Sequence, residues 1–176
     1  MSLRMFSIAV LFVCLSLVGP GLATAKEPTE ARQTGGPVCV DDVSVEKLGQ
    51  VMPDDASGLA LVTLRVTFAP GGEIAAHTHP GTLVVSIVSG EFEFTMLENV
   101  EHMIMRGGTA SQPSAAEHVA YNVPVVLEAG DWFEDPSGIV HSASNPGTEP
   151  TVALVSGLVD PDQPFTQCVL DSSASH

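Results

Sequence analysis

The sequence predicts an all-β domain, either a barrel or a sandwich. Its apolar residues alternate with polar ones in several short segments, which is the period of a strand that buries one face. Turns that contain Gly and Pro separate these segments, and no segment has the period of a convincing amphipathic helix. About 150 residues remain once the N-terminal stretch is set aside, which is enough for one domain with a real core but not comfortably for two.

The first half of the domain contains the clearest strands. Residues 60–68 alternate strictly, and Pro70-Gly71-Gly72 is expected to end this strand. Residues 82–88 are almost wholly apolar and β-branched, which predicts a second strand. Ser89-Gly90 predicts a turn into a third strand at 91–96, so that the second and third strands form a hairpin.

The second half contains a longer irregular stretch. Residues 98–120 include Gly107-Gly108 and a Ser/Ala/Pro segment, and we expect an insertion loop with one short strand around 103–106. Three further segments, each bounded by Gly or Pro turns, are predicted strands: residues 123–127, 139–142 and 151–159. The sequence shows no internal repeat.

The N-terminus has the parts of a signal peptide. Arg4 precedes an apolar run over residues 5–18, and Ala23-Thr24-Ala25 is a small-x-small cleavage site. The run is shorter than the roughly 18 residues expected of a membrane-spanning helix, although an uncleaved anchor is the alternative. We therefore expect an exported protein, secreted or periplasmic, with four parts: a signal peptide over 1–25, a flexible leader over 26–37, a β-barrel over 38–170 and a C-terminal tail over 171–176.

The chain is strongly acidic. The predicted signal peptide holds Arg4 and no Asp or Glu, so the mature chain would keep five Lys or Arg against 21 acidic residues, a net charge of −16. Affinity for nucleic acid rests on Lys and Arg contacts to phosphates, and anionic membranes attract the same residues. The charge therefore argues against both partners, and we expect a small-molecule ligand or substrate instead.

Two cysteines remain after cleavage of the predicted signal peptide, because Cys14 lies within it. Cys39 and Cys168 form an even pair near the two ends of the mature chain, which in an oxidising compartment predicts a disulfide. The chain-entropy model gives such a long loop a stabilisation of at most about 5 kcal/mol. Two unpaired thiols are the alternative.

His77 and His79 are separated by one residue. On an extended segment both side chains project from the same face, as two ligands of one metal ion must. The spacing alone is weak evidence, since such a pair also occurs by chance among surface or core histidines.

The segments around the histidines resemble the two motifs of the cupin family. The first has a glycine, five residues and then His-x-His: Gly71 and His77-Thr78-His79. The second reproduces the family's motif in full, with five fixed positions at set spacing: Gly130, Pro136, Gly138, His141 and Asn145. The resemblance extends over roughly residues 59–159 and does not account for the leader or the tail.

The resemblance implies a double-stranded β-helix, or jelly-roll barrel, with His77, His79 and His141 as metal ligands in its interior. The implied cofactor is a divalent ion, with Fe²⁺ favoured over Mn²⁺, Zn²⁺, Ni²⁺ or Cu²⁺. Cupin barrels commonly pair, so a homodimer is expected. The motif glycines Gly90 and Gly130 lie where tight turns need a left-handed backbone angle, so their structural role agrees with the motif.

One position departs from the family pattern. Members usually carry a glutamate ligand seven residues before the glycine that closes the first motif, here Gly90, and this chain has Leu83 there. Three imidazoles add no charge, so a divalent ion would stay strongly Lewis acidic and keep open positions. The resemblance does not make this site inactive, because the cysteine and gentisate dioxygenases work with three histidines.

Three other carboxylates are candidates to replace the missing ligand. Glu73 has the same strand parity as His77, and Glu91 and Glu134 lie close to the motifs. Each is near a turn, where a carboxylate is more often solvated.

The remaining histidines are less informative. His102 with Met103 and Met105 brings together nitrogen and sulfur donors that suit copper, although alternate methionines on a strand more often pack in a core. His118 and His176 are expected to be exposed. Three aromatic residues flank the second motif and could line a pocket, but we expect them to fill the barrel: Tyr121, Trp132 and Phe133.

The predicted site is compatible with two classes of function. The first is a small-molecule metalloenzyme of dioxygenase type, in which the three histidines hold iron(II) and no separate catalytic base is visible. The second is a non-catalytic module that captures a metal or small ligand, which the apolar Leu83 mildly favours. A metal-free domain with histidines as packing residues is a third interpretation.

Overall fold

The structure is a computed structural model that describes residues 39–108 and 114–169. The predicted signal peptide, the leader and the tail after residue 170 lie outside the described residues, so these three assignments stay predictions. Within the described ranges, no helix is long and apolar enough to cross a membrane.

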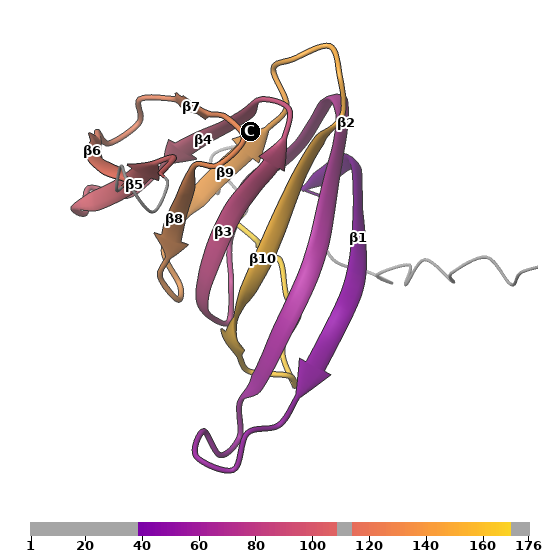
Figure 1. Ribbon diagram of the computed structural model, residues 1–176. Coiled ribbons are helices and arrows are strands. Elements are labelled where there is room, and N and C mark those ends of the chain that lie inside the picture. The colour runs from indigo at the N-terminus through magenta and orange to yellow at the C-terminus, as the bar shows by residue number, and fades with distance from the viewer. Residues whose placement is uncertain (1–38, 109–113, 170–176) are drawn as a thin grey trace, which may run out of the picture. The chain divides into compact units, whose positions relative to one another are not determined.

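The described residues form eleven strands in one antiparallel sheet that curls into a barrel (Figure 1). The strands are β1 (Val40–Val51), β2 (Ala60–Thr78), β3 (Gly81–Ser89), β4 (Phe92–Met96), β5 (His102–Arg106), β6 (Ala115–Val119), β7 (Val125–Leu127), β8 (Trp132–Asp135), β9 (His141–Ser144), β10 (Thr151–Val159) and β11 (Gln167–Cys168). Their order is β6-β5-β8-β3-β10-β2-β9-β4-β7, and β1 and β11 both pair with β2. The predicted all-β jelly-roll class is confirmed.

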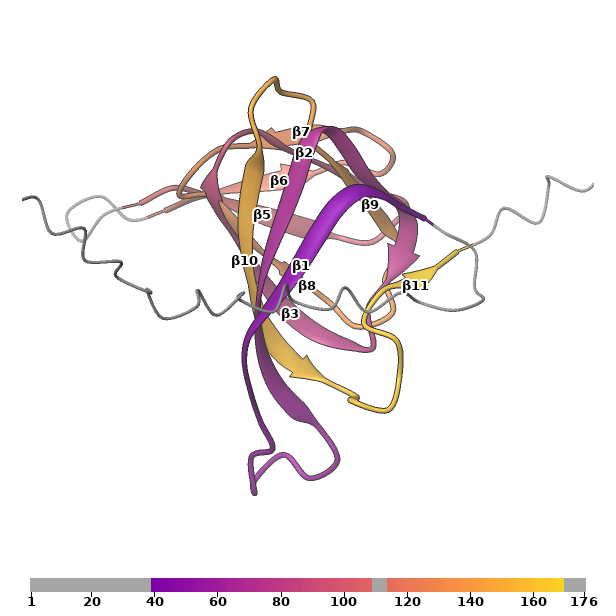
Figure 2. The same cartoon turned by 90° about the vertical axis from the view of Figure 1, so that its right-hand side faces the viewer.

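Strand β2 joins the two walls of the barrel. Its first part pairs with β1 and β10, whereas its last part, from Glu73 to Thr78, pairs with β9 and β11 and, at Glu73 and Ile74, with the start of β1 (Figure 2). The prediction that Pro70-Gly71-Gly72 ends the strand is therefore wrong, since these residues lie within it. They serve as a bend: Gly71 has a φ of +78°, and a Cβ at Gly72 would lie 2.5 Å from the carbonyl oxygen of Asp42.

The predicted hairpin of the strands before and after Gly90 is not formed. Strand β3 pairs with β8 and β10, whereas β4 pairs with β7 and β9. Gly90 does make the expected turn, with a φ of +80°. The turn carries the chain from one wall of the barrel to the other, where Phe92 and Phe94 of β4 are buried in the shared interior. A turn signal between two strands does not show whether they pair.

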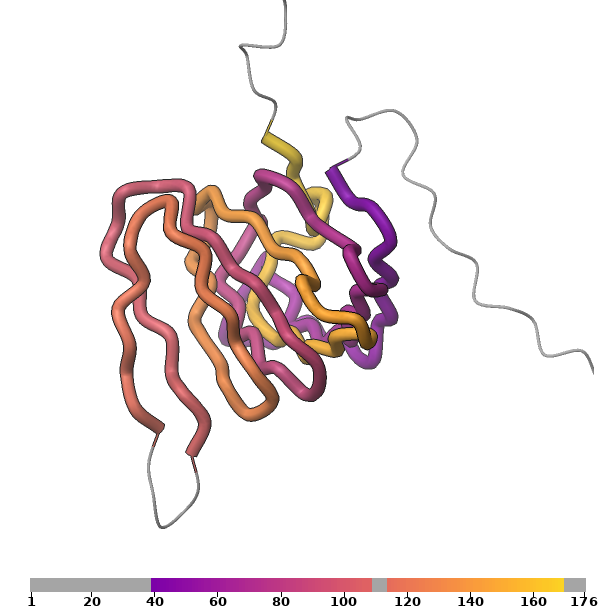
Figure 3. The backbone as a smooth tube through the Cα atoms, turned by 90° about the horizontal axis from the view of Figure 1, so that it is seen from above, coloured from indigo at the N-terminus to yellow at the C-terminus, as the bar shows by residue number. Residues whose placement is uncertain are grey.

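The short strand predicted around 103–106 is present as β5, but the rest of the predicted insertion loop at 98–120 contains a second strand, β6, that pairs with it. Strands β5 and β6 pair from His102 opposite Val119 to Arg106 opposite Ala115, and Figure 3 shows them, in pink and orange, extending to one side of the barrel. Arg106 of β5 links the two strands of the hairpin by donating to Glu117 of β6 at 2.7 Å, and it links the hairpin to the barrel by donating to Asp131 at 2.8 Å. Strand β6 could not be recognised from alternating apolar residues because four of its five residues are exposed.

The interior of the barrel is filled from both walls. Phe94 and Phe133 have ring centroids 4.5 Å apart, and Phe68 packs edge-on against Phe92 at 5.4 Å. The long strands of the other wall contribute a set of buried aliphatic side chains: Val62, Leu64, Val66, Leu83, Val85, Ile87, Ala153 and Val155. This apolar packing supports a small polar cluster at one end of the interior.

Asn145, the last residue of the second motif, fixes the bend of β2. Its buried Nδ2 donates to the carbonyl oxygens of Phe68 at 3.2 Å, Ala69 at 3.1 Å and Glu149 at 2.8 Å. Its backbone N–H donates to Gly72 at 2.9 Å. The asparagine therefore links the carbonyl oxygens at the bend of β2 to the loop that follows β9.

Replacing Asn145 should destabilise the fold. We expect Asn145→Ala to lower the free energy of unfolding by about 2 to 4 kcal/mol, because it removes the three hydrogen bonds that the buried Asn145 side chain donates. Urea unfolding checks this, with Thr148→Ala as the control, since Thr148 is exposed in the same loop. Equal stability of the two variants would contradict the role assigned to Asn145.

Candidate metal centre

The structure brings the three predicted histidines together. His77 lies near the end of β2, His79 follows that strand, and His141 opens β9 directly opposite His77. They are only 2%, 7% and 3% exposed. One ring nitrogen from each lies within 4.8 Å of the others, so the group could hold a metal ion.

Backbone carbonyls hold all three rings in one tautomer. Nδ1 of His77 donates to the carbonyl oxygen of Ala75 at 2.7 Å, and Nδ1 of His79 donates to that of Phe165 at 2.7 Å. Nδ1 of His141 donates to the carbonyl oxygen of Ile139 at 3.0 Å. A carbonyl can only accept, so each Nδ1 carries a hydrogen and, in the neutral ring, Nε2 keeps its lone pair. This is the arrangement of histidines prepared to bind a metal.

The histidines are neutral at physiological pH. Burial, followed by the neighbouring His79, lowers the pKa of His77 to about 4. Burial also lowers the pKa of His79, and burial with the two neighbouring imidazoles holds the pKa of His141 well below its usual 6.5. Protons therefore do not compete for the Nε2 lone pairs until the solution is distinctly acidic.

A fourth polar side chain, Asp135 at the end of β8, faces the same point. It is 2% exposed, and its Oδ2 lies 3.5 Å from Nε2 of His79 and 3.5 Å from Nε2 of His141. This oxygen has no hydrogen-bond partner among the described residues. Burial raises the pKa of Asp135 to about 8.

The sequence reasoning missed Asp135. Its one local signal is strand parity, because Asp135 alternates with Glu134 and shares the inward face with the buried Phe133. What places Asp135 in the site is the pairing register of β3 and β8, which sets Asp135 opposite Leu83. A motif within one segment of the sequence does not reveal how two strands pair.

The three carboxylates considered from the sequence all lie outside the site. Glu73, Glu91 and Glu134 are exposed. Glu73 shares its parity with His77 but not its face, because a bulge between Ile74 and His77 shifts the alternation by one residue.

The polar cluster opens into a small apolar cavity of about 50 Å³. Its walls include Leu83, Phe94 and Phe133, and its outer rim includes Phe165 and the exposed Val45. At roughly 10 to 15 Å³ for each water, this volume admits about three to five waters or one very small ligand.

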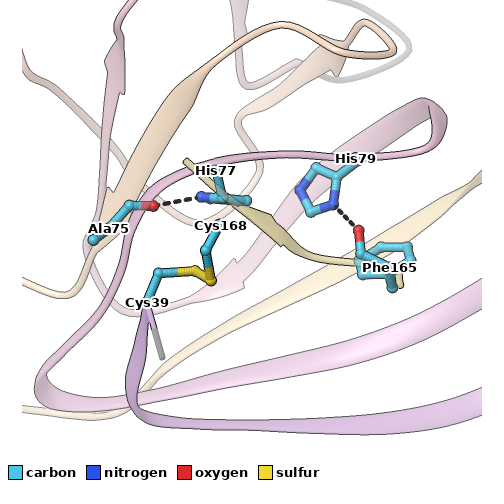
Figure 4. The surroundings of a disulfide bond; sticks show 6 residues. All are labelled: Cys39, Ala75, His77, His79, Phe165 and Cys168. Carbon is cyan, nitrogen blue, oxygen red and sulfur yellow. Dashed lines mark hydrogen bonds between the residues drawn. A yellow bond between two sulfur atoms is a disulfide. The ribbon is translucent and has the colours of Figure 1, made fainter. Parts of the chain in front are cut away.

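The C-terminal segment secures one side of the site. The predicted disulfide between Cys39 and Cys168 is present, and Cys168 on β11 pairs with His77 (Figure 4). Phe165, just before β11, accepts the His79 hydrogen bond and lies 4.8 Å from that ring, centroid to centroid. The disulfide therefore anchors the segment that orients His79.

The other candidate residues do not join the site. His102 is buried against Phe94, at 5.3 Å between ring centroids, whereas Met103 on the next position points outward, so they form no copper cluster on one face. His118 is exposed, as expected, and His176 lies outside the described residues. Of the three aromatic residues predicted to fill the barrel, Phe133 does so, but Trp132 and Tyr121 are exposed at 36% and 54%.

The chain belongs to the cupin family. The sequence profile described as Cupin matches residues 49–175, which include both histidine motifs and nearly all the described strands. Among curated proteins, no sequence matches the chain significantly.

Solved structures with a similar fold include two further cupins and one enzyme. A cupin-like protein from Thermotoga maritima MSB8 is 17% identical, with 84% of this chain and 92% of that chain covered and a TM-score of 0.49. A cupin superfamily protein from Desulfitobacterium hafniense DCB-2 is 17% identical, with 74% and 84% covered and a TM-score of 0.44. Oxalate oxidase in complex with glycolate is 24% identical, with 78% and 62% covered and a TM-score of 0.41.

The donor set fits a divalent metal ion. Three neutral imidazoles and one buried carboxyl oxygen that has no hydrogen-bond partner among the described residues are groups that first-row transition metals bind, and all four side chains line the same cavity.

Removing the disulfide should weaken metal binding as well as stability. The double variant Cys39→Ser/Cys168→Ser releases β11, so the hydrogen bond from His79 to Phe165 should loosen and Zn²⁺ affinity should fall by about tenfold, as for other partners of ligating histidines. Unfolding stability should fall by at most about 5 kcal/mol. Zn²⁺ titration and urea unfolding measure the two effects, and unchanged affinity would contradict the coupling.

The metal-free protein should be most stable near pH 6.5. Below this pH the unfolded histidines take up protons that His77, His79 and His141 resist in the fold, so stability falls. Above this pH, Asp135 is ionised in the unfolded chain but stays protonated in the fold up to its raised pKa of about 8. The free energy of unfolding therefore falls again, by about 1 to 2 kcal/mol between pH 6.5 and 8. Urea unfolding across pH checks this, and Asp135→Asn should remove only the alkaline decline.

Proposed function

We propose that this protein is an exported cupin metalloenzyme that oxidises a small molecule with oxygen. His77, His79 and His141 would hold a divalent ion, with Fe²⁺ favoured. The observation that carries the proposal is the set of three neutral imidazoles with free Nε2 lone pairs at the end of a buried cavity. When bound, the ion supplies a Lewis-acidic, redox-active centre with positions left for small ligands.

The chain itself would contribute orientation and exclusion of water. The carbonyls of Ala75, Ile139 and Phe165 fix the rings before any ligand arrives, so little reorganisation accompanies binding. The apolar walls around Leu83 and Phe133 keep bulk water from the centre and strengthen electrostatic interactions within it.

The size of the cavity limits the substrate. About 50 Å³ admits only a few non-hydrogen atoms beside the histidines, so a larger compound would have to displace the rim at Val45 and Phe165. In a dioxygenase reaction both atoms of O₂ enter the product and the substrate supplies all four electrons, so no separate reductant is needed.

Export and pairing belong to the same proposal. The signal-peptide pattern at 1–25 supports export, as does the disulfide, because such bonds persist in oxidising compartments. A homodimer is supported by β1, which in the described part of the chain pairs with β2 alone and exposes Val45, Leu48 and Val51.

The second candidate function is ligand binding without turnover. Among the described residues, the cavity has no charged side chain beyond the cluster itself, and the rest of its wall is almost entirely apolar. Such a pocket can hold a small compound without acting on it.

An oxygen-consumption assay separates the two functions. Protein loaded with Fe²⁺ should consume oxygen in the presence of one member of a panel of catechol-like, thiol and diketone compounds. His141→Ala should abolish this activity, whereas His118→Ala, which replaces an exposed histidine, should retain it. Loaded protein that neither consumes oxygen nor turns over any compound overturns the enzymatic proposal, and calorimetric binding of a compound under those conditions supports the binding module.

A further inference from the structure

We propose that Asp135 is the carboxylate ligand of this centre, supplied from β8 and directly bound to the same ion as the three histidines. The inference rests on the proposed metal centre and adds a residue that neither cupin motif contributes as a ligand in this sequence. The ligand set of the ion would then be three imidazoles and one carboxylate rather than three imidazoles alone.

The distances match neighbouring ligands of one ion. Ligand atoms about 2.0 to 2.2 Å from a metal stand roughly 3.0 to 3.5 Å apart along the edge of an octahedron or tetrahedron. Oδ2 of Asp135 lies 3.5 Å from Nε2 of both His79 and His141. A direct hydrogen bond would need about 2.7 to 3.2 Å, so neither contact is one.

The chemistry of the facing atoms also calls for a cation. Each ring already donates its Nδ1 hydrogen to a carbonyl, so the Nε2 atoms that face Asp135 are acceptors, and the oxygens of Asp135 are acceptors once its carboxyl group has lost its proton. The protonated carboxyl group of the metal-free protein does not pair with these rings either, because Oδ2 lies 3.5 Å from both Nε2 atoms. A buried acceptor without a donor is costly, and Oδ2 has no partner among the described residues. A metal ion at the common point satisfies all of these lone pairs at once.

Local structure fixes the carboxylate relative to the histidines. Asp135 precedes the Pro136–Gly138 turn that leads to His141, and the N–H of Gly138 donates to the carbonyl oxygen of His79 at 3.1 Å. The same turn therefore ties together the backbone around all three residues, and Asp135 belongs to a rigid strand end rather than to a loop.

Leu83 explains why the carboxylate enters from β8. It stands opposite Asp135 in the β3–β8 register, and both side chains line the cavity. The two positions therefore offer alternative routes to one point, and in this chain the apolar residue occupies one and the carboxylate the other.

Zn²⁺ affinity tests the proposal without reference to activity. In chelator-competition titrations, Asp135→Asn and Asp135→Leu should weaken Zn²⁺ binding at least tenfold, and the Co²⁺ absorption spectrum should change because a ligand is lost. Glu134→Gln is the matched control, since it removes the same charge from the adjacent, exposed position. Its affinity should stay within about twofold of the parent, and urea unfolding should show that each variant is folded.

A swap variant adds an independent readout. Leu83→Glu combined with Asp135→Leu returns a carboxylate to the cavity from the facing strand and should recover affinity relative to Asp135→Leu alone. If both Asp135 variants bind Zn²⁺ like the parent while His141→Ala does not, Asp135 is no ligand but the histidine centre stands. If the parent protein binds neither Zn²⁺ nor Co²⁺, the centre and this inference both fail.

Discussion

The pairing of the end of β2 with β9 is the constraint on which the site depends, because it sets His77 directly opposite His141. Side chains of a strand alternate between faces, so a slip of one residue would turn one of these rings out of the barrel. The bulge after Ile74 places both Ile74 and His77 on the inner face despite their odd spacing. Asn145 stabilises the bend earlier in β2, so the second motif helps to set the position of the first.

The hydrogen bonds that hold the three rings differ in the sequence distance between their partners, so the rings depend on different parts of the fold. His77 and His141 each bond the carbonyl two residues earlier, so any chain that keeps the local strand geometry keeps those bonds. His79 bonds Phe165, 86 residues away, and so depends on the C-terminal segment. The disulfide closes that segment against the start of β1, so it limits the freedom of the His79 ring as well as that of the unfolded chain.

Much of the fold could be predicted from the sequence because burial on one face leaves a period of two, as in residues 60–68 and 151–159. The wrong predictions concern exposed strands, the pairing of strands and the bend of β2, which the period of two does not report. Strand β6 is almost wholly exposed and so has no apolar face to detect. Strand β3 is a nearly continuous apolar run and β4 alternates, but neither pattern shows that each pairs with other strands. Glycines read as the end of β2 instead bend it, because a breaker signal does not distinguish a bend from a stop.

The same distinction separates the three histidines from Asp135. The histidines were predictable because a motif records ligands by their spacing along the chain. A carboxylate can reach the cavity from any strand whose register brings it there, and Asp135 does so from a position that faces Leu83 across two paired strands. The loss of the glutamate at one motif position therefore does not leave the cavity without a carboxyl group. Whether a cupin-like centre of this kind has a carboxylate depends on both residues of that cross-strand pair, because the barrel interior is shared by the strands that surround it.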